Sequence, residues 1–283
     1  MLCFPAMAAA EESFLPEEPD YAFVTGSPYT ETKKFLQIIL TNFFNSFDEA
    51  GITSRELNNF LRFEYGITDR LEADLVLNFN DQWNSGADGN SDAHGFGDTL
   101  LGLRYRILRE PEFPITLSFG PQILLPGSFS KSFSSGGFGL AWDLTTGREW
   151  NRWFFHYLSL NYATTFAAKD PTQGSFSDFN LHNFNWGVAL GFRPIEKTTR
   201  SGGRHDLHVT IEASGTFGQS VAAGSVQGFP TTDNEIIFVP GLRYGYITPK
   251  KFLAEVGLAG VIGLSSDSPD WGLILQTQWE FGF

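Results

Sequence analysis

Charged side chains recur at every second position in several stretches of the 283-residue sequence. Glu56, Arg62 and Glu64 share one side of such an alternation, while leucines and aromatic residues take the other side. In other segments, further charged residues also take the side opposite the apolar residues: Glu72, Asp74, Arg104, Arg106, Glu212, Arg243, Glu255 and Glu280. Opposite charges across a strand pair stabilise it by roughly 0.2–1 kcal/mol. The same groups can also line a constriction that filters solutes by charge, and the sequence leaves both interpretations open.

Two hairpins predict particular charge pairs. A hairpin centred on Thr68 would place Arg62 directly opposite Asp74. A hairpin centred on Pro249 would place Arg243 opposite Glu255. Both pairs would face the polar side of the sheet.

Catalytic and metal-binding patterns are weak. His205 and His208 are three residues apart, which puts them on opposite faces of a strand and disfavours a shared metal. A lipid-cleaving membrane enzyme would need a Ser–His–Asn set. His182 and Asn183 are adjacent in the sequence, but no serine motif accompanies them. The sequence has no Gly-x-Ser-x-Gly elbow or phosphate-binding glycine loop. We therefore predict no catalytic residue, metal or cofactor.

The elements that must position these side chains are strands. The last thirteen residues alternate strictly, with an apolar face and a polar or small face. Aromatic residues bound the apolar face, as in a strand that spans a bilayer. The predicted aromatic girdle comprises Tyr65, Tyr105, Trp271, Trp279, Phe281 and Phe283. A terminal Phe after such a strand resembles the C-terminal signature of bacterial outer-membrane barrels, which the barrel-assembly machinery recognises.

Twelve such segments follow one another without a helical interval. They are 33–47, 54–67, 70–83, 96–108, 113–126, 136–148, 152–166, 181–194, 205–219, 234–248, 250–264 and 270–283. Each exceeds the roughly 9–11 residues that cross a bilayer, and no stretch approaches the about 18 apolar residues of a membrane helix. We predict an all-β fold: a single transmembrane antiparallel up-and-down β-barrel over 33–283, whose last strand closes against 33–47.

Connections alternate in length. Short turns at 66–70, 109–113, 149–151 and 248–250 face longer loops near 84–95, 127–135, 167–180 and 220–233, and 195–204 breaks the rule. Short periplasmic turns and longer external loops are typical of these barrels. Lys and Arg gather on the short-turn side and Asp and Glu on the other side, which suggests contacts with outer-membrane lipids and lipopolysaccharide, or ordinary loop solvation.

The N-terminal region differs from the rest. Residues 1–10 resemble the end of a signal peptide; a lipid-anchored Cys3 is the alternative, although no lipobox precedes it. Residues 11–32 are acidic and proline-rich, which predicts a periplasmic tail or a plug. The net charge of −13 excludes nucleic acid as a partner, because phosphate binding needs a basic surface.

Three motifs resemble one family. Residues 65–71 (Tyr-Gly-Ile-Thr-Asp-Arg-Leu), 96–106 (Phe-Gly-Asp-Thr-Leu-Leu-Gly-Leu-Arg-Tyr-Arg) and 121–127 (Pro-Gln-Ile-Leu-Leu-Pro-Gly) are similar to the outer-membrane family named for the meta-pathway of phenol degradation. Ser128 departs from the Thr-Gly that usually continues the third motif. The resemblance covers about 54–283 and implies a β-barrel with a transport role.

We therefore predict a bacterial outer-membrane channel that passes small solutes passively, including aromatic or hydrophobic compounds. The alternatives are a barrel enzyme acting on lipid and a closed structural or adhesion barrel.

Overall fold

A computed structural model describes residues 22–49, 51–86, 89–127, 133–134, 136–151, 153–168, 179–199, 202–220, 231–248 and 252–283. Thirteen strands form one sheet: β1 (Phe35–Glu49), β2 (Ile52–Thr68), β3 (Leu71–Gly86), β4 (Gly89–Phe96), β5 (Thr99–Leu108), β6 (Thr116–Leu125), β7 (Phe138–Asn151), β8 (Phe154–Ala168), β9 (Phe179–Thr198), β10 (Arg204–Ser220), β11 (Thr231–Ile247), β12 (Leu253–Gly263) and β13 (Trp271–Gly282). Among the described residues, no helix is long and apolar enough to cross a membrane.

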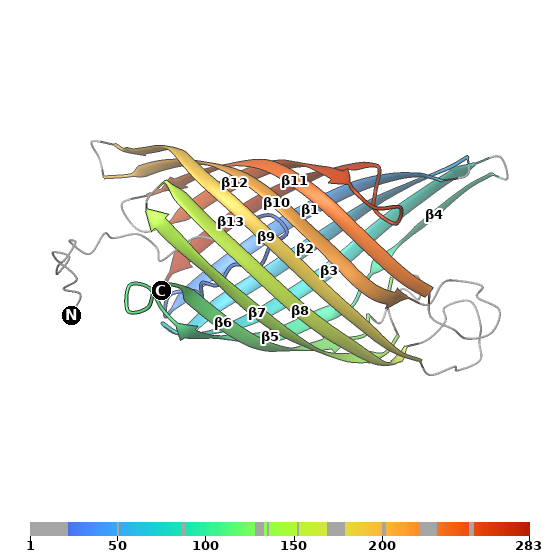
Figure 1. Cartoon of the computed structure of the whole chain (residues 1–283), viewed down its shortest axis with the longest axis horizontal. Helices are drawn as coiled ribbons and strands as arrows, with labels where there is room; N and C mark the ends of the chain where they lie inside the picture. The colour runs from blue at the N-terminus through green and yellow to red at the C-terminus, as the bar shows by residue number, and fades with distance from the viewer. Residues whose placement is uncertain are drawn as a thin grey trace, which may run out of the picture.

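The sheet closes into an antiparallel barrel. β1 pairs with both β2 and β13, and a β2–β3 pairing completes the ring. The strands run obliquely around the barrel (Figure 1). Because the sheet closes on itself, most of its strands are paired on both sides and have no free edge. The predicted barrel, and its closure by the last strand against β1, are confirmed.

The strand that the sequence did not predict is β4, which occupies part of the predicted loop at 84–95. β3 continues to Gly86 and turns back as β4, which pairs with Phe79–Gly86. β5 then takes over the pairing with β3 at Leu71–Val76. β4 and β5 thus lie end to end beside β3 and share one strand position in the barrel. The barrel therefore has twelve strand positions and thirteen strands. Polar and small residues in β4 weakened its alternation, which is why it escaped prediction.

Both predicted hairpin registers are wrong. An irregularity between Gly66 and Thr68 makes Glu64, rather than Arg62, the partner of Asp74. In the β11–β12 hairpin, Arg243 faces Gly257. A period-two pattern cannot detect either shift, because a displacement by two residues keeps every side chain on its own face.

The β9–β10 connection is also shorter than predicted. Both strands extend toward the turn until Thr198 pairs with Arg204, so most of 195–204 is hairpin. Thr199 closes this turn by hydrogen bonding to Gly203 at 3.0 Å. Much of the predicted external loops, including 128–132, 169–178 and 221–230, lies outside the described residues.

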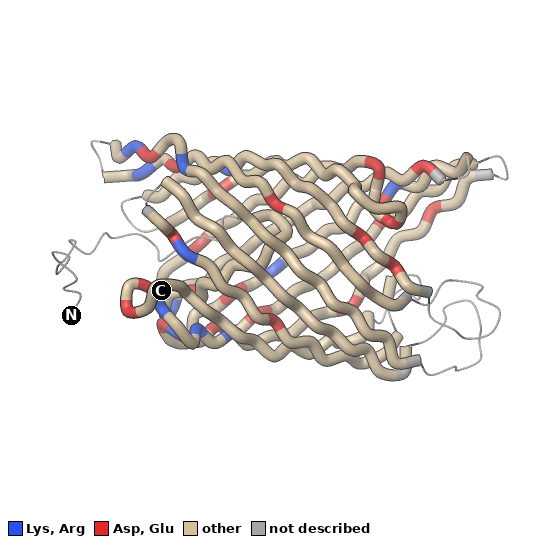
Figure 2. The backbone as a smooth tube through the Cα atoms, in the orientation of Figure 1, with Lys and Arg blue, Asp and Glu red and all other residues tan. Residues whose placement is uncertain are grey.

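The two faces of the wall differ as a bilayer requires. The outer face carries exposed apolar side chains from nearly every strand, whereas the buried charged side chains of the strands lie on the inner face. The predicted girdle residues point outward, and Phe283 is 79% exposed at the C-terminus. Figure 2 shows Lys and Arg mainly at the barrel end that holds the C-terminus, and Asp and Glu prevailing toward the opposite end.

Candidate functional site

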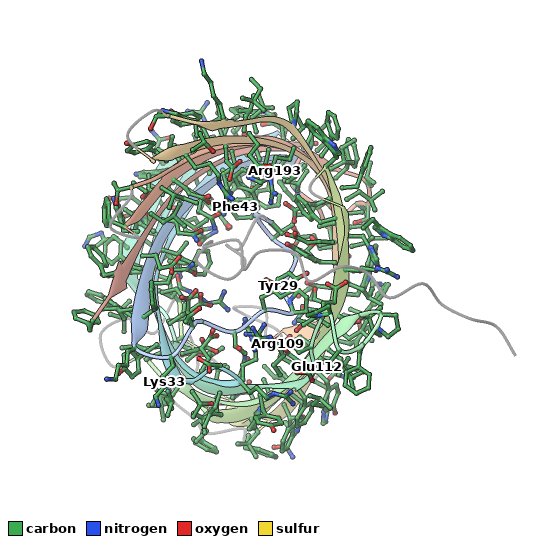
Figure 3. The ribbon with its side chains drawn as sticks, turned by 90° about the vertical axis from the view of Figure 1, so that its left-hand side faces the viewer. Tyr29, Lys33, Phe43, Arg109, Glu112 and Arg193 are labelled. Carbon is green, nitrogen blue, oxygen red and sulfur yellow. The ribbon has the colours of Figure 1, made fainter. Side chains whose placement is uncertain are left out.

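Residues Ala22–Thr32, here called the lumenal segment, lie inside the barrel. In the view down the barrel, Tyr29 lies within the ring of strands and Lys33 at its edge (Figure 3). The segment's contacts run along the inner wall from β10 and β11, past β8, β7 and β6, to β5, β3 and β2. Residues 1–21 lie outside the described residues, so the predicted signal peptide and the first part of the acidic tail stay predictions.

Glu212 of β10 holds the start of the lumenal segment. Its carboxylate accepts hydrogen bonds from the backbone N–H groups of Phe23 at 2.6 Å, Val24 at 3.0 Å and Thr25 at 2.9 Å. Glu212 is 1% exposed. A buried carboxylate needs charge-assisted partners, and here the backbone of a distant segment provides them.

Arg243 of β11 holds the same end from the neighbouring wall. Its Nη2 donates to the carbonyl of Ala22 at 2.9 Å, and its guanidinium lies 4.9 Å from the centre of the Phe23 ring. Nη1 pairs with Glu255 at 3.5 Å. The predicted Arg243–Glu255 pair therefore forms, although diagonally across the strands. Gln276 and Gln278 on the polar face of β13 also accept hydrogen bonds from Arg243.

Three wall residues hold the other end. Arg104 Nη1 donates to the carbonyl of Tyr29 at 3.3 Å. Arg106 donates to the Thr30 hydroxyl through Nε and to the Thr30 carbonyl through Nη2, both at 3.1 Å. Glu72 accepts the backbone N–H of Glu31 at 2.6 Å. Between the two ends, the Ser118 hydroxyl donates to the carbonyl of Pro28.

Gly66 marks the place where the lumenal segment passes over β2. A Cβ at this position would lie 2.0 Å from the carbonyl oxygen of Thr32. The backbones can therefore approach this closely only because position 66 carries no side chain. Lys34 then donates its backbone N–H to the Gly66 carbonyl at 2.8 Å, which leads the chain into β1.

A group of buried carboxylates lies where the lumenal segment meets β2 and β3. Glu31, Glu64 and Glu72 place ligand oxygens within 4.8 Å of one another. Arg62 pairs with Glu64 at 3.2 Å and Arg104 with Glu72 at 3.5 Å. These are the oxygen donors with which the described residues could hold a hard cation, and the arginines compensate part of their charge.

A cavity of about 370 Å³ adjoins the lumenal segment. Val24 and Gly26 contribute to its lining. The wall residues around it are polar, among them Arg62, Arg104, Gln122, Asp143, Asn161 and Asn185. Asn185 bridges two strands, donating to Asn161 at 3.1 Å and accepting from Thr216 at 2.8 Å. We call this cavity the chamber.

The opposite part of the inner wall is apolar. Phe23 of the lumenal segment packs in a buried cluster with side chains from β11, β12 and β13, against which Val24 and Phe43 also pack. The wall members are Ile237, Val239, Ala259, Val261 and Ile274. The lumen thus has a polar wall and an apolar wall, and the lumenal segment contacts both.

Ion pairs follow the inner wall toward the short-turn end. Arg193 contacts Glu149 at 3.7 Å, and Arg204 contacts Asp206 at 2.6 Å. In the β5–β6 turn, Glu110 lies 3.6 Å from Arg148 and accepts the Tyr29 hydroxyl at 3.2 Å. Partial burial raises the pKa of the Glu110 carboxyl above its usual value.

The predicted charged residues all lie on the inner face, where several of them bind the lumenal segment. These include Arg104, Arg106, Glu72, Glu212 and Arg243. Arg62 and Arg104 line the chamber. The buried Glu280 of β13 faces Gln37 in register. Sequence reasoning missed the partners contributed by Tyr29, Thr30 and Ser118, and the chamber residues Asn161 and Asn185. The polar phase of each strand is the signal that could have identified the wall residues.

His182 and Asn183, the pair that the sequence offered beside an external loop, have separate contacts. His182 Nδ1 contacts the hydroxyls of Tyr162 and Thr164 on the outer wall. Asn183 instead accepts the backbone N–H of Gln219, and as the next residue of the strand it faces the other way. The neighbouring His182 and Asn183 therefore cannot act together.

No protein-family model matches the sequence, and no curated protein matches it. Solved structures do share its architecture. A crystal structure of an outer membrane channel from Pseudomonas putida F1 aligns with a TM-score of 0.63 at 15% identity, covering 92% of this chain and 100% of that one. The β domain of the Bordetella autotransporter Brka aligns with a TM-score of 0.52 at 11% identity, covering 89% and 100%. The chain therefore has the fold of a bacterial outer-membrane β-barrel.

Proposed function

We propose that this protein is a bacterial outer-membrane channel for passive uptake of small solutes, and that the lumenal segment is its gate. The observation that carries this proposal is the pair of anchors: Glu212 with Arg243 at one end, and Arg104 with Arg106 at the other. Most of these bonds reach the segment's backbone. Such bonds constrain its path without requiring particular side chains, and the chamber lies directly beside it.

The two unlike walls suggest which solutes pass. Hydrogen-bonding side chains around the chamber suit a polar group, while the apolar cluster suits an aromatic or aliphatic body. Small aromatic or otherwise hydrophobic compounds combine both features. The resemblance to the phenol-degradation family supports the same solute class, and this link is part of the proposal.

The remaining assignments belong to the same proposal. Residues 1–10 are the end of a signal peptide, and 11–32 include the gate. The outer wall contacts membrane lipids and lipopolysaccharide, and the strand ending in Phe283 is recognised by the barrel-assembly machinery. The protein is not an enzyme and needs no cofactor.

A disulfide lock tests the gate. A Cβ at Gly26 would lie 3.5 Å from the Cβ of Ser159 on β8, within the range of disulfide-bonded cysteines. We therefore suggest the pair Gly26→Cys and Ser159→Cys in a Cys3→Ser background. Conductance in planar bilayers is measured under oxidising conditions and again after reduction.

The channel proposal predicts stepwise conductance that the disulfide suppresses and reduction restores. Each single cysteine variant serves as a control and should be insensitive to the redox state. Conductance that ignores the disulfide would exclude the segment as a gate. Absence of conductance in every state, with hydrolysis of added phospholipid, would instead favour the enzyme.

Solute class is tested separately by liposome swelling with phenolic and sugar solutes of similar size. Faster swelling with the phenolic solutes supports the preference for apolar bodies. Equal rates would contradict that preference but leave the channel itself in place.

A further inference from the structure

The lipid-facing wall contains a polar site at the middle of the apolar belt. Asn42 of β1 points outward, because its neighbours Thr41 and Phe43 point into the lumen, where they contact Gln276 and the apolar cluster. Asn59 of β2 lies directly opposite Asn42. It shares the outward phase of Leu61.

The depth of this site follows from the strand register. Asn42 pairs with Leu275 of β13, which stands four residues from each of the outward-facing Trp271 and Trp279. These tryptophans belong to the two aromatic girdles that bound the belt. Asn42 therefore lies near the middle of the belt, and Asn59 is its partner on the neighbouring strand.

Outward-facing positions on other strands carry exposed apolar side chains. They include Leu101, Ile123, Leu144, Val188, Ile211, Leu242 and Leu258. A carboxamide placed among lipid tails loses hydrogen bonds that water would supply. The two adjacent amides thus stand out from a wall that otherwise suits lipid.

Each amide has hydrogen-bonding capacity left for a partner. Asn42 Nδ2 donates to the carbonyl of Leu275 at 3.4 Å, and Asn59 Nδ2 donates to that of Phe79 at 3.3 Å. A carboxamide has two N–H donors and an oxygen with two lone pairs. Within the described part of the chain, each therefore retains an N–H and its oxygen for a group outside the barrel.

We propose that this site is the centre of an interface with a second copy of the chain. A two-fold axis along the membrane normal keeps every residue at its own depth, and an isologous contact brings residue i of one copy to residue j of the other. Asn42 and Asn59 lie side by side on neighbouring strands, and each amide is both donor and acceptor. Asn42 of either copy meets Asn59 of the other, and the remaining donors and acceptors are satisfied reciprocally. This inference is independent of the channel's solute and gate.

Cysteine cross-linking in membranes tests the interface. In a Cys3→Ser background, chains carrying Asn42→Cys and differently tagged chains carrying Asn59→Cys are expressed together and oxidised. The expected product is a mixed disulfide-linked dimer at twice the mass of the chain. Leu258→Cys on β12 gives the background yield of chance collisions.

A second measurement separates association from folding. The double variant Asn42→Leu with Asn59→Leu is expected to run as a monomer in native mass spectrometry, where the unmodified protein is a dimer. Heat-modifiable gel mobility reports that the barrel still folds. A monomeric unmodified protein, a cross-link no more abundant than that of Leu258→Cys, or an adduct of another mass would overturn the proposal.

Discussion

The carboxylate of Glu212 on β10 accepts the backbone N–H of Phe23 at 2.6 Å, across 189 residues of sequence. The same carboxylate accepts the next two backbone N–H groups. In the sequence, Glu212 is one of several charged residues on the polar face of its strand. In the structure, it anchors a segment inside the barrel. This contact links the wall to the segment that we propose as the gate.

Replacing this anchor should loosen the lumenal segment. In Glu212→Ala, three backbone N–H groups lose a charged acceptor, and hydrogen bonds to charged groups contribute roughly 1.5–3 kcal/mol. We expect more frequent and longer open events in single-channel recordings than in the unmodified protein. The matched control is Thr210→Val, a buried inward-facing neighbour on the same strand. An unchanged open probability in Glu212→Ala would show that this contact does not restrain the gate.

Charge selectivity should depend on Arg62. Its side chain lines the chamber and is 27% exposed, whereas Arg104 and Arg106 also hold the lumenal segment. Arg62→Gln removes a positive charge from the chamber, so the reversal potential in a KCl gradient should shift toward cation preference. Arg70→Gln in the β2–β3 turn, whose side chain pairs with Glu112, should leave it unchanged. Equal reversal potentials for Arg62→Gln and the unmodified protein would exclude a filter role.

Gly66→Ala should destabilise the barrel where the lumenal segment joins β1. The added methyl would meet the Thr32 carbonyl at 2.0 Å, so one backbone must move, and overpacking typically costs about 1–3 kcal/mol. We expect a lower midpoint of urea unfolding in detergent. Gly260→Ala is the control, since nothing lies within 4 Å of its Cβ. Similar midpoints for the two variants would contradict the close approach.

Glu110 should make stability depend on pH. Its pKa is raised chiefly by burial, so between the unfolded and folded pKa values the folded state binds more protons, and its contribution to stability falls as pH rises. The unmodified protein should therefore lose this contribution to stability as the pH rises from about 4 to about 7. Glu110→Gln lacks this carboxyl and should not show that loss, so the stability difference between the two proteins should change over this range. Urea midpoints across this range measure the difference. The exposed Glu112 supplies the control variant Glu112→Gln, and a pH-independent difference for Glu110→Gln would refute the prediction.

The alternation of side chains determined the strands, their faces and the closed barrel. A bilayer requires an apolar outer face at every crossing, so strands such as β13 carry the signal locally, within a dozen residues. Asn42 and Asn59 could be placed on the outer face in the same way. Their pairing with each other, and the position of Asn42 opposite Leu275, required the register of β1, β2 and β13.

The tertiary structure alone decided what the inward charges contact. The shift at Gly66–Thr68 moved Asp74 opposite Glu64, which a period-two pattern cannot distinguish from the predicted pairing. The lumenal segment has no periodicity of its own, because wall side chains such as Glu212 and Arg106 bind its backbone. Backbone groups are the same in every sequence, so only the folded barrel shows which residues they meet.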